Sequence, residues 1–466
     1  MLEILFIAWQ VVFLGFFLGV NGSYLLLNVL SYGPMRKRMS EETGQAYPVV
    51  ENGLELPISL LVPAYNEEKV IVESVRSFLA LDYPDYEIIV CLDGSTDQSL
   101  NRLIDAFELQ PGVTWAHGAL RTQPVLAAYV SKRYSKLTVL HKANGGKADA
   151  LNAALNVSRC PLLCTVDADS ILEPDSLRRI AHPFMADPSI AGVGGTIRVA
   201  NSCTIEHGRI VDVAAPREWL ARFQTVEYMR AFLFGRTGFN RLHALPLVSG
   251  AFGVFRKTAI LEAGGFRTGH VGEDMEIVLR LHRARIQHGK PWKVVSLPDP
   301  VCWTEVPEDI PSLAAQRNRW HRGLTQNLIE YRSLMLKPKG KWLSWFALPF
   351  MAIGEWLGPL IELLGYAGLL LFYGKGVISA QALAAFGLLA LGSGTLLSVS
   401  AFILEELSFR VYTQPKDIAM LLAAALLENF GYRQLTVWWR VRGMADAFIK
   451  HKGAWGKMER KPFAST

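Results

Sequence analysis

The stretch LTVLHKANGGKADALNAALNVSRCPLLCTVDADS, residues 137–170, has the pattern of a strand, a helix and a second strand. Two short runs in it, 137–141 and 161–167, are too continuously apolar for strands of a sheet with one solvated face. Between them, residues 147–157 have the pattern of a helix. A strand, a helix and a second strand in this order form a right-handed βαβ unit, so we expect a mostly parallel sheet covered on both faces.

The same alternation extends to both sides of this stretch. Two more strands and three more helices are predicted, at residues 58–63, 86–93, 67–80, 96–108 and 175–185. Residues 57–335 as a whole are therefore expected to form one large α/β domain.

The composition indicates a protein that is part soluble and part membrane-embedded. Of the 466 residues, 50% are hydrophobic and 19% are charged, which is too apolar for an ordinary soluble protein and too charged for a pure membrane bundle. The net charge of +6 is too small to argue for nucleic acid, and no nucleic-acid partner is expected. The five cysteines form no C-x-x-C pair, so we expect them to be reduced, cytosolic and mostly buried.

Residues 1–34 form a predicted N-terminal transmembrane anchor. Their apolar part, residues 4–30, exceeds the ~30 Å hydrocarbon core and is too long, without a basic start, for a cleaved signal peptide. Basic residues follow at 36–38, so the positive-inside rule places the N-terminus outside and the α/β domain in the cytoplasm. We therefore expect a multi-pass protein of the inner (plasma) membrane.

The chain after residue 340 is divided by prediction into a C-terminal transmembrane or interfacial region, 341–439, and a basic cytoplasmic tail, 440–466. Segments 341–373 and 378–404 are each long enough to span, and polar residues interrupt a third candidate, 416–439. Three full spans would place the basic tail outside, against the positive-inside rule. Either the third candidate is interfacial or re-entrant, or the first segment is broken at Gly358-Pro359.

Carboxylates follow three of the predicted strands, in the motifs YNE (65–67), DGSTD (93–97) and DADS (167–170). Each motif alone is a common turn or helix cap. In an open parallel sheet, however, ligands bind outside the carboxyl ends of the strands, and three such ends meet at one edge. Their coincidence there predicts a binding site.

A divalent cation and a diphosphate are the predicted ligands of this edge. Asp167 and Asp169 can both approach Mg²⁺ or Mn²⁺, which takes one or two carboxylates together with phosphate oxygens. The segment KANGGK (142–147) offers backbone N–H groups at a helix start and the point charge of Lys147. It lacks the spacing of a Walker sequence, so a nucleotide diphosphate is expected, held differently from the way an ATPase holds it.

Six motifs in this order, flanked by membrane segments, resemble the processive inverting membrane glycosyltransferases, the family of cellulose, chitin, hyaluronan and poly-N-acetylglucosamine synthases. They are YNE (65–67), DGSTD (93–97), GGKADALN (145–152), DADS (167–170), GED (272–274) and QRNRW (316–320). The resemblance covers residues 57–335 closely and the membrane segments in outline. It implies a glycosyltransferase-A-like nucleotide-sugar transferase domain inserted between transmembrane helices.

The resemblance also implies roles for residues that match the motifs. On the donor side, Tyr65, Glu67 and Asp93 would hold the uridine of a UDP-sugar, Lys147 and Asp167 would contact the nucleotide-sugar, and Asp169 would ligate the metal. On the acceptor side, Trp320 would contact the terminal sugar, and Gln316 and Arg319 the donor diphosphate.

Asp274 would be the general base. Inversion at an anomeric carbon independently requires one carboxylate that takes the proton of the acceptor hydroxyl. The alternative is that Glu273 and Asp274 are first-turn acids of a helix at 275–283 and interact only with its dipole.

The motif QRNRW lies in residues 312–333, a predicted amphipathic helix on the inner membrane surface. Gln316, Arg319 and Trp320 are spaced three and four residues apart, so they can point at one site. The alternative is an interfacial Trp/Arg anchor without a catalytic part.

Glu355, Glu362 and Glu428 lie within apolar segments, where ionisable groups are functional candidates. Our hypothesis is that some of them line a hydrated path for an emerging polysaccharide.

Two positions depart from the family pattern: Leu92, where an acidic residue is often found, and Gly272, where cellulose-type enzymes carry threonine. Neither change removes a proposed catalytic group, but both weaken any transfer of sugar preference from cellulose synthase. N-acetylglucosamine is favoured over glucose only by resemblance in overall size and layout.

Three functions remain open at this point. The preferred one is a processive, metal-dependent synthase that uses a UDP-sugar, a polysaccharide acceptor and the lipid bilayer, with accessory export or regulatory subunits unknown. The second is a non-processive transferase with a lipid acceptor, such as a polyprenyl phosphate or a sphingolipid. The third, a membrane scaffold that only binds nucleotide, ranks last because Asp169 and Asp274 are both present.

Overall fold

The structure, a computed structural model, describes residues 2–41, 55–113 and 118–449. The chain divides into two compact units. Of the described residues, the sheet unit comprises 40–41, 55–113, 118–216 and 245–306, and the helical unit comprises 2–39, 217–244 and 307–449.

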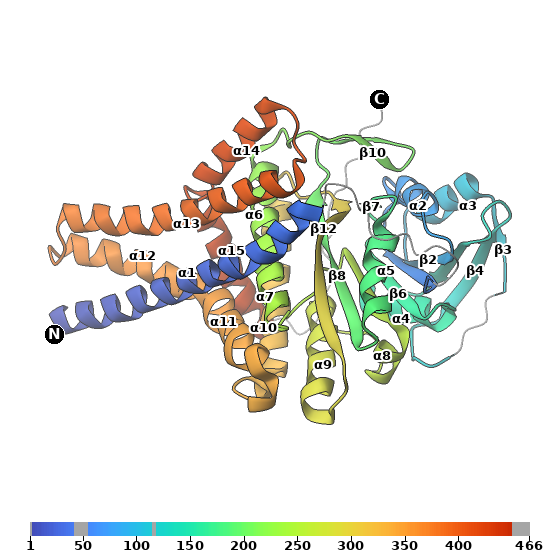
Figure 1. The fold of residues 1–466 in the computed structure, drawn as a ribbon, viewed down its shortest axis with the longest axis horizontal. Helices are drawn as coiled ribbons and strands as arrows, with labels where there is room; N and C mark the ends of the chain where they lie inside the picture. Colours follow the sequence, from blue (N-terminus) through green and yellow to red (C-terminus); the bar gives the residue numbers. More distant parts are fainter. Residues whose placement is uncertain (1, 42–54, 114–117, 450–466) are drawn as a thin grey trace. The chain divides into compact units, whose positions relative to one another are not determined.

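A ten-stranded sheet is the framework of the sheet unit (Figure 1). In spatial order its strands are β3 (Leu109–Pro111), β4 (Val125–Ser131), β5 (Leu137–Lys142), β2 (Tyr86–Asp93), β1 (Ile58–Ala64), β6 (Leu162–Val166), β11 (Phe252–Arg256), β8 (Ile190–Val199), β12 (Lys293–Thr304) and β7 (Ser170–Leu172). A two-stranded hairpin, β9 (Thr204–Glu206) with β10 (Arg209–Asp212), lies outside this sheet.

The central strands β5, β2, β1 and β6 are parallel and confirm the four strands predicted from the sequence. Ile58 of β1 aligns with Tyr86 of β2 and with Leu162 of β6, and all residues of β1 and β2 are buried. In the described part of this sheet, each antiparallel pair includes a strand that was not predicted, such as β11 between β6 and β8. The sheet is therefore mixed, with the predicted parallel order at its centre.

The helices of the sheet unit are α2 (Ile71–Leu79), α3 (Ser99–Phe107), α4 (Lys147–Val157), α5 (Ser176–Ala186), α8 (Lys257–Glu262) and α9 (Glu273–His288). The predicted helix at 147–157 is α4, which packs on β1 and β2 and has almost no exposed residue. All five cysteines are free and buried in the sheet unit, as expected.

The helical unit is built from three separate segments of the chain. Its elements are α1 (Leu2–Glu41), α6 (Trp219–Met229), η1 (Arg230–Arg236), α7 (Thr237–Arg241), α10 (Ile310–Glu330), η2 (Arg332–Leu334), η3 (Pro338–Gly340), η4 (Leu343–Ala347), α11 (Leu348–Phe350), η5 (Met351–Trp356), α12 (Gly358–Gly374), α13 (Ala380–Phe409), α14 (Pro415–Leu427) and α15 (Tyr432–Ile449).

The middle segment, residues 217–244, is an excursion of the chain into the helical unit. Val226 of α6 packs in a buried cluster with Ala424 of α14, and Leu233 of η1 packs with Met35 of α1. The single domain expected at 57–335 is therefore divided, because this excursion and the residues after 306 belong to the helical unit.

Two of the described helices are long and apolar enough to cross a membrane, residues 4–35 of α1 and the whole of α13. A third span results if residues 343–356 and 358–374 form one segment, which bends by 44° at the break. The break falls beside the Gly358-Pro359 pair, where proline lacks the N–H that would continue the helix. The predicted break of this segment is thus confirmed.

The third C-terminal candidate, residues 416–439, is not one helix. It divides into α14, of 13 residues, and α15, of 18 residues, with the break around Glu428–Gly431. Neither helix is among the candidate spans in the described residues. Residues 440–449, predicted as the start of the basic tail, form the second half of α15, and the basic residues from 450 onward lie outside the described part.

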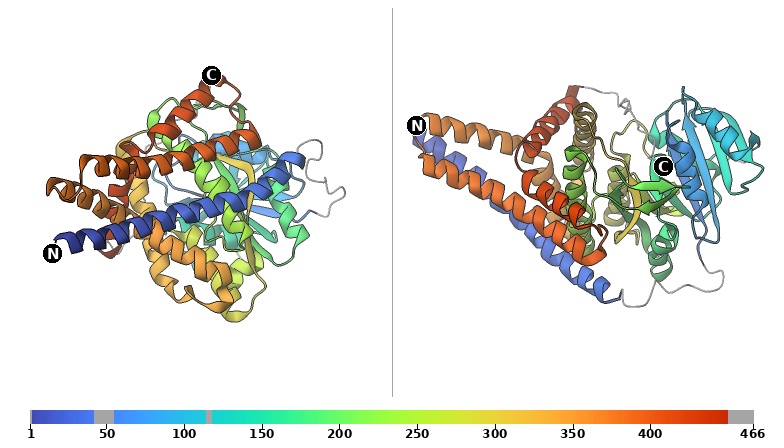
Figure 2. Two further views of the ribbon diagram at one scale, coloured as in Figure 1. Left: turned by 60° about the vertical axis from the view of Figure 1, so that its left-hand side comes forward. Right: turned by 90° about the horizontal axis from the view of Figure 1, so that it is seen from above.

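The N-terminal helix α1 lies beside α12 and α13 in the helical unit (Figure 2). A Cβ added at Gly365 or Gly368 of α12 would come within 2.0 Å of the Phe13 ring and 2.2 Å of the Trp9 indole, respectively. The two glycines therefore form notches that receive the rings of α1, a use of small residues that is common between membrane helices.

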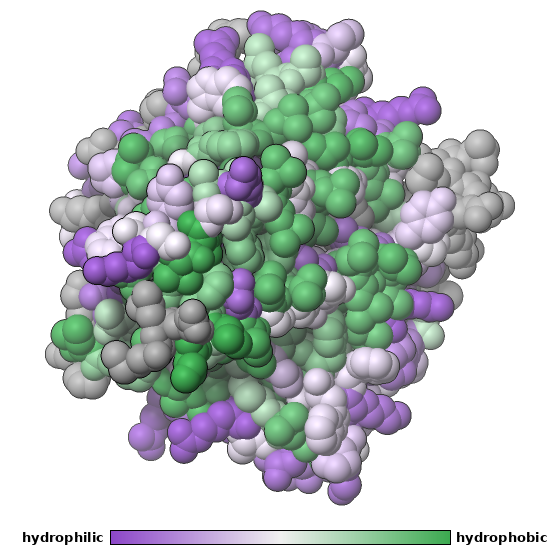
Figure 3. All heavy atoms as spheres, turned by 90° about the vertical axis from the view of Figure 1, so that its left-hand side faces the viewer, coloured by the Kyte–Doolittle hydropathy of each residue, from purple (hydrophilic) through white to green (hydrophobic). Residues whose placement is uncertain are grey.

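Large apolar side chains remain exposed on α1, α12 and α13. They include Ile4, Val11, Leu18, Leu370 and Leu388, each at least 62% exposed. Figure 3 looks onto the side that carries the free ends of these helices and shows apolar side chains gathered there. An exposed apolar surface of this kind is typical of helices that face lipid.

Candidate active site

The loops after β1 and β2 are tied together by short hydrogen bonds. The Asn66 N–H donates to Ser95 Oγ at 3.1 Å, and the Thr96 N–H donates to Asn66 Oδ1 at 2.8 Å. Asn66 has a φ of 57°, which asparagine tolerates better than most residues. The predicted nucleoside residues lie here, with Tyr65 half-buried and Glu67 buried.

Asp93 ends β2 and is directed into the neighbouring glycine loop. Its carboxylate accepts the Gly145 N–H at 2.9 Å and the Gly146 N–H at 2.7 Å, and it pairs with Lys142. Its side chain is 5% exposed. In this structure, the carboxylate predicted to hold uridine therefore binds the loop KANGGK.

The two glycines of this loop are required by its geometry. A Cβ on Gly145 would come within 2.4 Å of the Asp149 carboxylate, and Gly146 has a φ of 89°, which favours glycine. The loop leads directly into Lys147, the first residue of α4, so the backbone at the start of this helix is held by Asp93.

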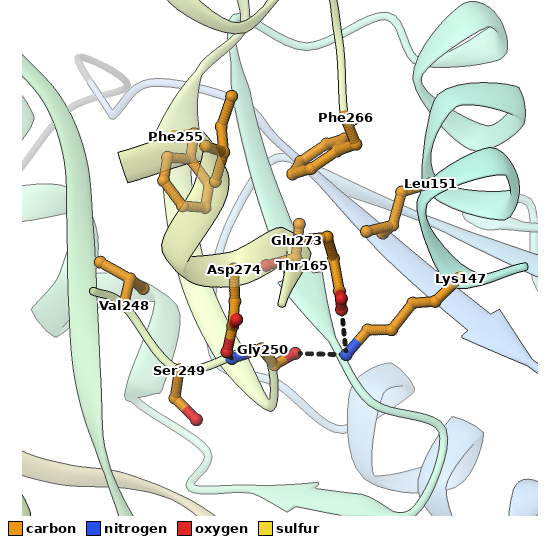
Figure 4. A pocket seen from close by; sticks show the side chains of 11 residues that line it. Lys147, Leu151, Thr165, Val248, Ser249, Gly250, Phe255, Phe266, Glu273 and Asp274 are labelled. Atoms are coloured by element: carbon orange, nitrogen blue, oxygen red, sulfur yellow. Dashed lines mark hydrogen bonds and ion pairs between the residues drawn. The ribbon is translucent and has the colours of Figure 1, made fainter. Parts of the chain in front are cut away.

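Lys147 points toward Glu273 and Gly250 (Figure 4), and it also pairs with Asp167 after β6. Its ammonium is 2.6 Å from Asp167 Oδ1 and 3.3 Å from Glu273 Oε1, and it donates to the Gly250 carbonyl at 3.3 Å. Burial lowers the pKa of a lysine, but the charges of Asp167 and Glu273 outweigh burial and raise the Lys147 pKa. Lys147 is therefore a cation throughout the physiological range.

Asp274 is in the first turn of α9, and its Oδ2 accepts the Gly250 N–H at 3.2 Å. Gly250 thus contacts Lys147 through its carbonyl and Asp274 through its N–H. The adjacent Glu273 has a raised pKa because burial and the Asp274 charge together outweigh Lys147. Both acids also lie at the positive end of the helix dipole. A role of Asp274 as general base and an interaction of these acids with the helix dipole are therefore compatible.

Asp167 and Asp169 follow β6 and differ in exposure, with Asp167 half-buried and Asp169 buried. Burial raises the pKa of the Cys302 thiol, and the charges of both aspartates add to this effect. In the described residues, no third His, Cys, Asp or Glu side chain joins them in a metal-binding cluster. Two carboxylates suit Mg²⁺ or Mn²⁺ when phosphate oxygens complete the coordination, so the donor set fits a metal that binds with its nucleotide.

A small pocket adjoins these groups, between α4, α9 and the loop before β11 (Figure 4). Its lining combines charged and apolar side chains: Lys147, Leu151, Thr165, Val248, Ser249, Gly250, Phe255, Phe266, Glu273, Asp274 and Ile277. The structure therefore connects four predicted site residues of the sheet unit, Asp93, Lys147, Asp167 and Asp274, through Gly146 and Gly250.

The three residues predicted for the acceptor side lie on α10 in the helical unit. Gln316 is buried, Arg319 is half-buried and the Trp320 side chain is 44% exposed. The guanidinium of Arg317, which was not predicted, lies 4.5 Å from the centre of the Trp320 ring and pairs with Glu227 at 2.7 Å. The Trp320 indole therefore packs against the Arg317 guanidinium, which is held in place by Glu227.

The three glutamates of the apolar segments each pair with an arginine in the helical unit. The pairs are Glu355 with Arg440 at 2.8 Å, Glu362 with Arg433 at 2.8 Å and Glu428 with Arg230 at 2.5 Å. A pair of opposite charges is the usual way in which a charge is tolerated away from water.

Sequence reasoning missed several of these partners. Lys142, which pairs with Asp93, was counted only as part of a phosphate loop, and Glu227 and Arg230 lie in a segment with no recognised motif. A lysine at the end of a strand, beside a strand that ends in aspartate, is the signal that would have indicated the first pair.

Two bacterial synthases resemble the chain. It is 27% identical over 298 residues to the poly-β-1,6-N-acetyl-D-glucosamine synthase of Staphylococcus epidermidis, a match that covers 64% of the chain and 61% of that protein. The synthase of the same name from Staphylococcus aureus is 26% identical over 266 residues, covering 57% and 54%. The chain therefore spans less than two thirds of the length of these relatives.

A solved structure and a family profile complete the comparison. The mannosyltransferase from Pyrobaculum calidifontis, in complex with GDP-Man and Mn²⁺, has a TM-score of 0.50 at 18% identity and covers 89% of the chain and 99% of its own, which indicates a shared glycosyltransferase-A-like fold. Residues 56–323 match the profile described as glycosyltransferase like family 2. Because this match covers more than half of the chain, the protein belongs to glycosyltransferase family 2.

Proposed function

We propose that this family 2 membrane glycosyltransferase is a processive, inverting synthase, which transfers sugar from a UDP-sugar to a growing β-linked polysaccharide. The observation that carries the proposal is the cluster around Lys147. It holds a cation for a diphosphate, carboxylates for a metal, and Asp274 on the other side of Gly250. These are the groups that nucleotide-sugar transfer requires.

Donor binding is assigned to the carboxyl ends of β1, β2 and β6. In our proposal Tyr65, Glu67 and Asp93 serve the uridine, and Lys147 and Asp167 serve the diphosphate and sugar. Asp169, with Asp167 beside it, would hold Mg²⁺ or Mn²⁺, and the bound ion would stabilise the negative charge of the leaving diphosphate. The ammonium of Lys147 is a second positive charge that would stabilise the leaving diphosphate.

Asp274 is proposed as the general base. Its Oδ2 accepts the Gly250 N–H, and it lies at a helix N-terminus, so the carboxylate is held in one orientation. From that position Asp274 takes the proton of the acceptor hydroxyl as the hydroxyl oxygen attacks the anomeric carbon. The sugar configuration inverts because attack and departure occur on opposite faces.

N-acetylglucosamine is the proposed sugar and poly-N-acetylglucosamine the proposed product. The named activity of the two staphylococcal relatives supports this choice, and the Mn²⁺ of the archaeal mannosyltransferase supports a divalent metal. The notched packing of α1 on α12, and the lipid-type surface of both helices, support a multi-pass protein of the inner membrane. In our proposal the sheet unit lies on the cytoplasmic side.

The size of the product tests the proposal. The full-length protein in lipid nanodiscs is incubated with radiolabelled UDP-N-acetylglucosamine and Mn²⁺ or Mg²⁺, with Asp274→Asn as the inactive control. We expect polymer that elutes near the void volume of a sizing column and is degraded by a glycosidase specific for the linkage. A single labelled lipid, with no polymer, would instead establish the non-processive alternative.

The acceptor role of α10 is tested separately. We expect Trp320→Ala to reduce sugar transfer about tenfold or more while UDP-sugar hydrolysis stays near the wild-type rate, since the loss of a stacking platform affects only the acceptor. Trp219→Ala is the matched control, because Trp219 is also 44% exposed and lies in the same unit. Equal loss of transfer and hydrolysis would make Trp320 a structural residue.

A further inference from the structure

The ammonium of Lys142 is fully buried and has a complete set of partners. It pairs with Asp93, lies 2.6 Å from Asp149 Oδ2 and donates to the Ala143 carbonyl at 2.6 Å. An ammonium group has three N–H donors, so these three acceptors satisfy all of them. The side-chain exposure is 0% for Lys142, 5% for Asp93 and 7% for Asp149.

These partners belong to three different elements. Asp93 and Lys142 are aligned residues at the carboxyl ends of the parallel strands β2 and β5, and Asp149 is in the first turn of α4. Lys142 therefore joins two strand ends to the helix that follows, at the edge where the donor is proposed to bind.

The glycine loop is held by the same group of charges. Asp93, fixed by Lys142, accepts the N–H groups of Gly145 and Gly146, and Gly145 passes so close to Asp149 that a side chain would not fit. The next residue is Lys147, whose ammonium contacts Asp167 and Glu273. The position of Lys147 thus depends, through two backbone N–H groups, on the buried Lys142.

We propose that Lys142 is a positioning residue for nucleotide-diphosphate binding: Asp149 ties it to α4, it holds Asp93, Asp93 holds the glycine loop, and the loop holds Lys147. This inference rests on the proposed function. Lys142 itself touches no ligand in this scheme, since its donors are all used within the protein.

Two variants separate positioning from simple charge balance. Lys142→Met removes the bridge and leaves two buried carboxylates without their cation. Lys142→Met combined with Asp149→Asn restores the net charge of the cluster, one negative charge as in the wild type, but not the bridge. Lys132→Met is the matched control, because Lys132 is an exposed lysine shortly before β5.

Hydrogen exchange on the full-length protein in nanodiscs measures how well the backbone N–H groups of the glycine loop are protected when no nucleotide is present. We expect faster exchange in the peptide that contains Gly145 and Gly146 in both Lys142 variants, while the peptide of β1 stays as in the wild type. We expect the affinity for UDP with Mn²⁺, measured by calorimetry, to weaken about tenfold or more in both variants. This is the usual loss when a partner that orients a ligand-binding side chain is removed. Lys132→Met should change neither.

The outcomes are distinct. Unchanged loop exchange in the double variant overturns the inference, and so does loop exchange that increases while UDP affinity stays unchanged. Faster exchange throughout the sheet unit would mean that Lys142 serves stability alone, which also overturns it. If the wild-type protein binds no UDP, the proposed function fails, and the exchange result still decides whether Lys142 holds the loop.

Discussion

The charges of the sheet unit and of the helical unit are arranged in opposite ways. Around Lys147 in the sheet unit, three acids from two distant parts of the sequence, Asp167 and the neighbours Glu273 and Asp274, surround one base. In the helical unit, glutamates and arginines pair one to one, as in Glu355 with Arg440. A surplus of negative charge favours a further cation and its ligand, whereas matched pairs need nothing more, so the balance of charge distinguishes a binding site from a structural contact.

The sharpest test of this contrast is the acid proposed as the base. We expect Asp274→Asn to lower sugar transfer by ~10²–10⁴, the usual contribution of general-base catalysis, and to leave UDP binding intact. Steady-state transfer and calorimetric UDP binding measure the two effects. Glu276→Gln is the control, because Glu276 lies in the same helical turn but pairs with Arg280. A wild-type transfer rate in Asp274→Asn would refute the assignment.

The surplus of carboxylates also predicts dependence on a divalent metal. We expect Asp169→Ala to lower transfer about a hundredfold, because the leaving diphosphate loses several kcal/mol of charge stabilisation. A chelator should reproduce this loss in the wild-type protein, and added Mn²⁺ or Mg²⁺ should reverse it. Asp97→Asn is a suitable control, since Asp97 lies at the same edge of the sheet and accepts the backbone N–H groups of Glu68 and Ser99. Chelator-resistant transfer would contradict the metal proposal.

In the helical unit, breaking a matched pair should affect stability more than chemistry. Glu355→Gln takes the carboxylate away from Arg440, which keeps the Glu355 backbone carbonyl as an acceptor. Because the two side chains are only half-buried, we expect the free energy of unfolding to fall by about 2–3 kcal/mol, less than for a fully buried pair. Glu355→Gln with Arg440→Met should recover much of this loss. Thermal unfolding in nanodiscs measures both. An unchanged melting temperature in the single variant would show that the pair is not structural.

The hypothesis of a hydrated path makes a competing prediction for the same glutamates. If Glu355 and Glu362 line a path for the polymer, Glu355→Leu with Glu362→Leu should reduce polymer export in proteoliposomes even when the protein remains folded. Export that continues at the wild-type rate would count against the path and leave the pairs as structural contacts.

The smallest effect that we expect is a pH dependence of stability, which arises in the sheet unit from a residue outside the candidate active site. Burial and the nearby Arg285 lower the pKa of His282, on α9, to about 4. Between pH 6.5 and pH 4 the unfolded chain binds a proton that the folded chain does not, so stability falls as the pH falls through this window. Between pH 7 and pH 4, we expect the unfolding free energy of the wild type to fall by about 2 kcal/mol more than that of the His282→Gln variant. Parallel curves would contradict the buried neutral histidine.

The centre of the sheet was predictable because its strands are apolar without interruption. Strand β8 was missed because Gly192, Gly194 and Gly195 resemble turn residues, although they are small for a packing reason. A Cβ at Gly195 would come within 2.4 Å of Val301 and 2.5 Å of Phe252. Local sequence does not show that a neighbouring strand occupies this space.

The candidate site was predictable only in part for a similar reason. The strand-end acids have motifs, and the order of strands places them at one edge, so their meeting with Lys147 follows from topology. The contacts of Gly250 with Lys147 and Asp274 have no such signal, because Gly250 lies in a loop about a hundred residues from Lys147. The arginine partners of the membrane glutamates were missed because they come from helices that only tertiary packing brings together.

The excursion at residues 217–244 sets a limit on how the enzyme can be divided for experiments. A fragment that starts after α1 and ends before α12 would include Val226 and Leu233 but lack Ala424 and Met35, against which they are buried. Such a fragment would expose apolar surface to water and aggregate, however well its sheet folds. Soluble preparations should therefore replace 217–244 with a short polar linker and end at residue 306, or keep the whole chain in lipid.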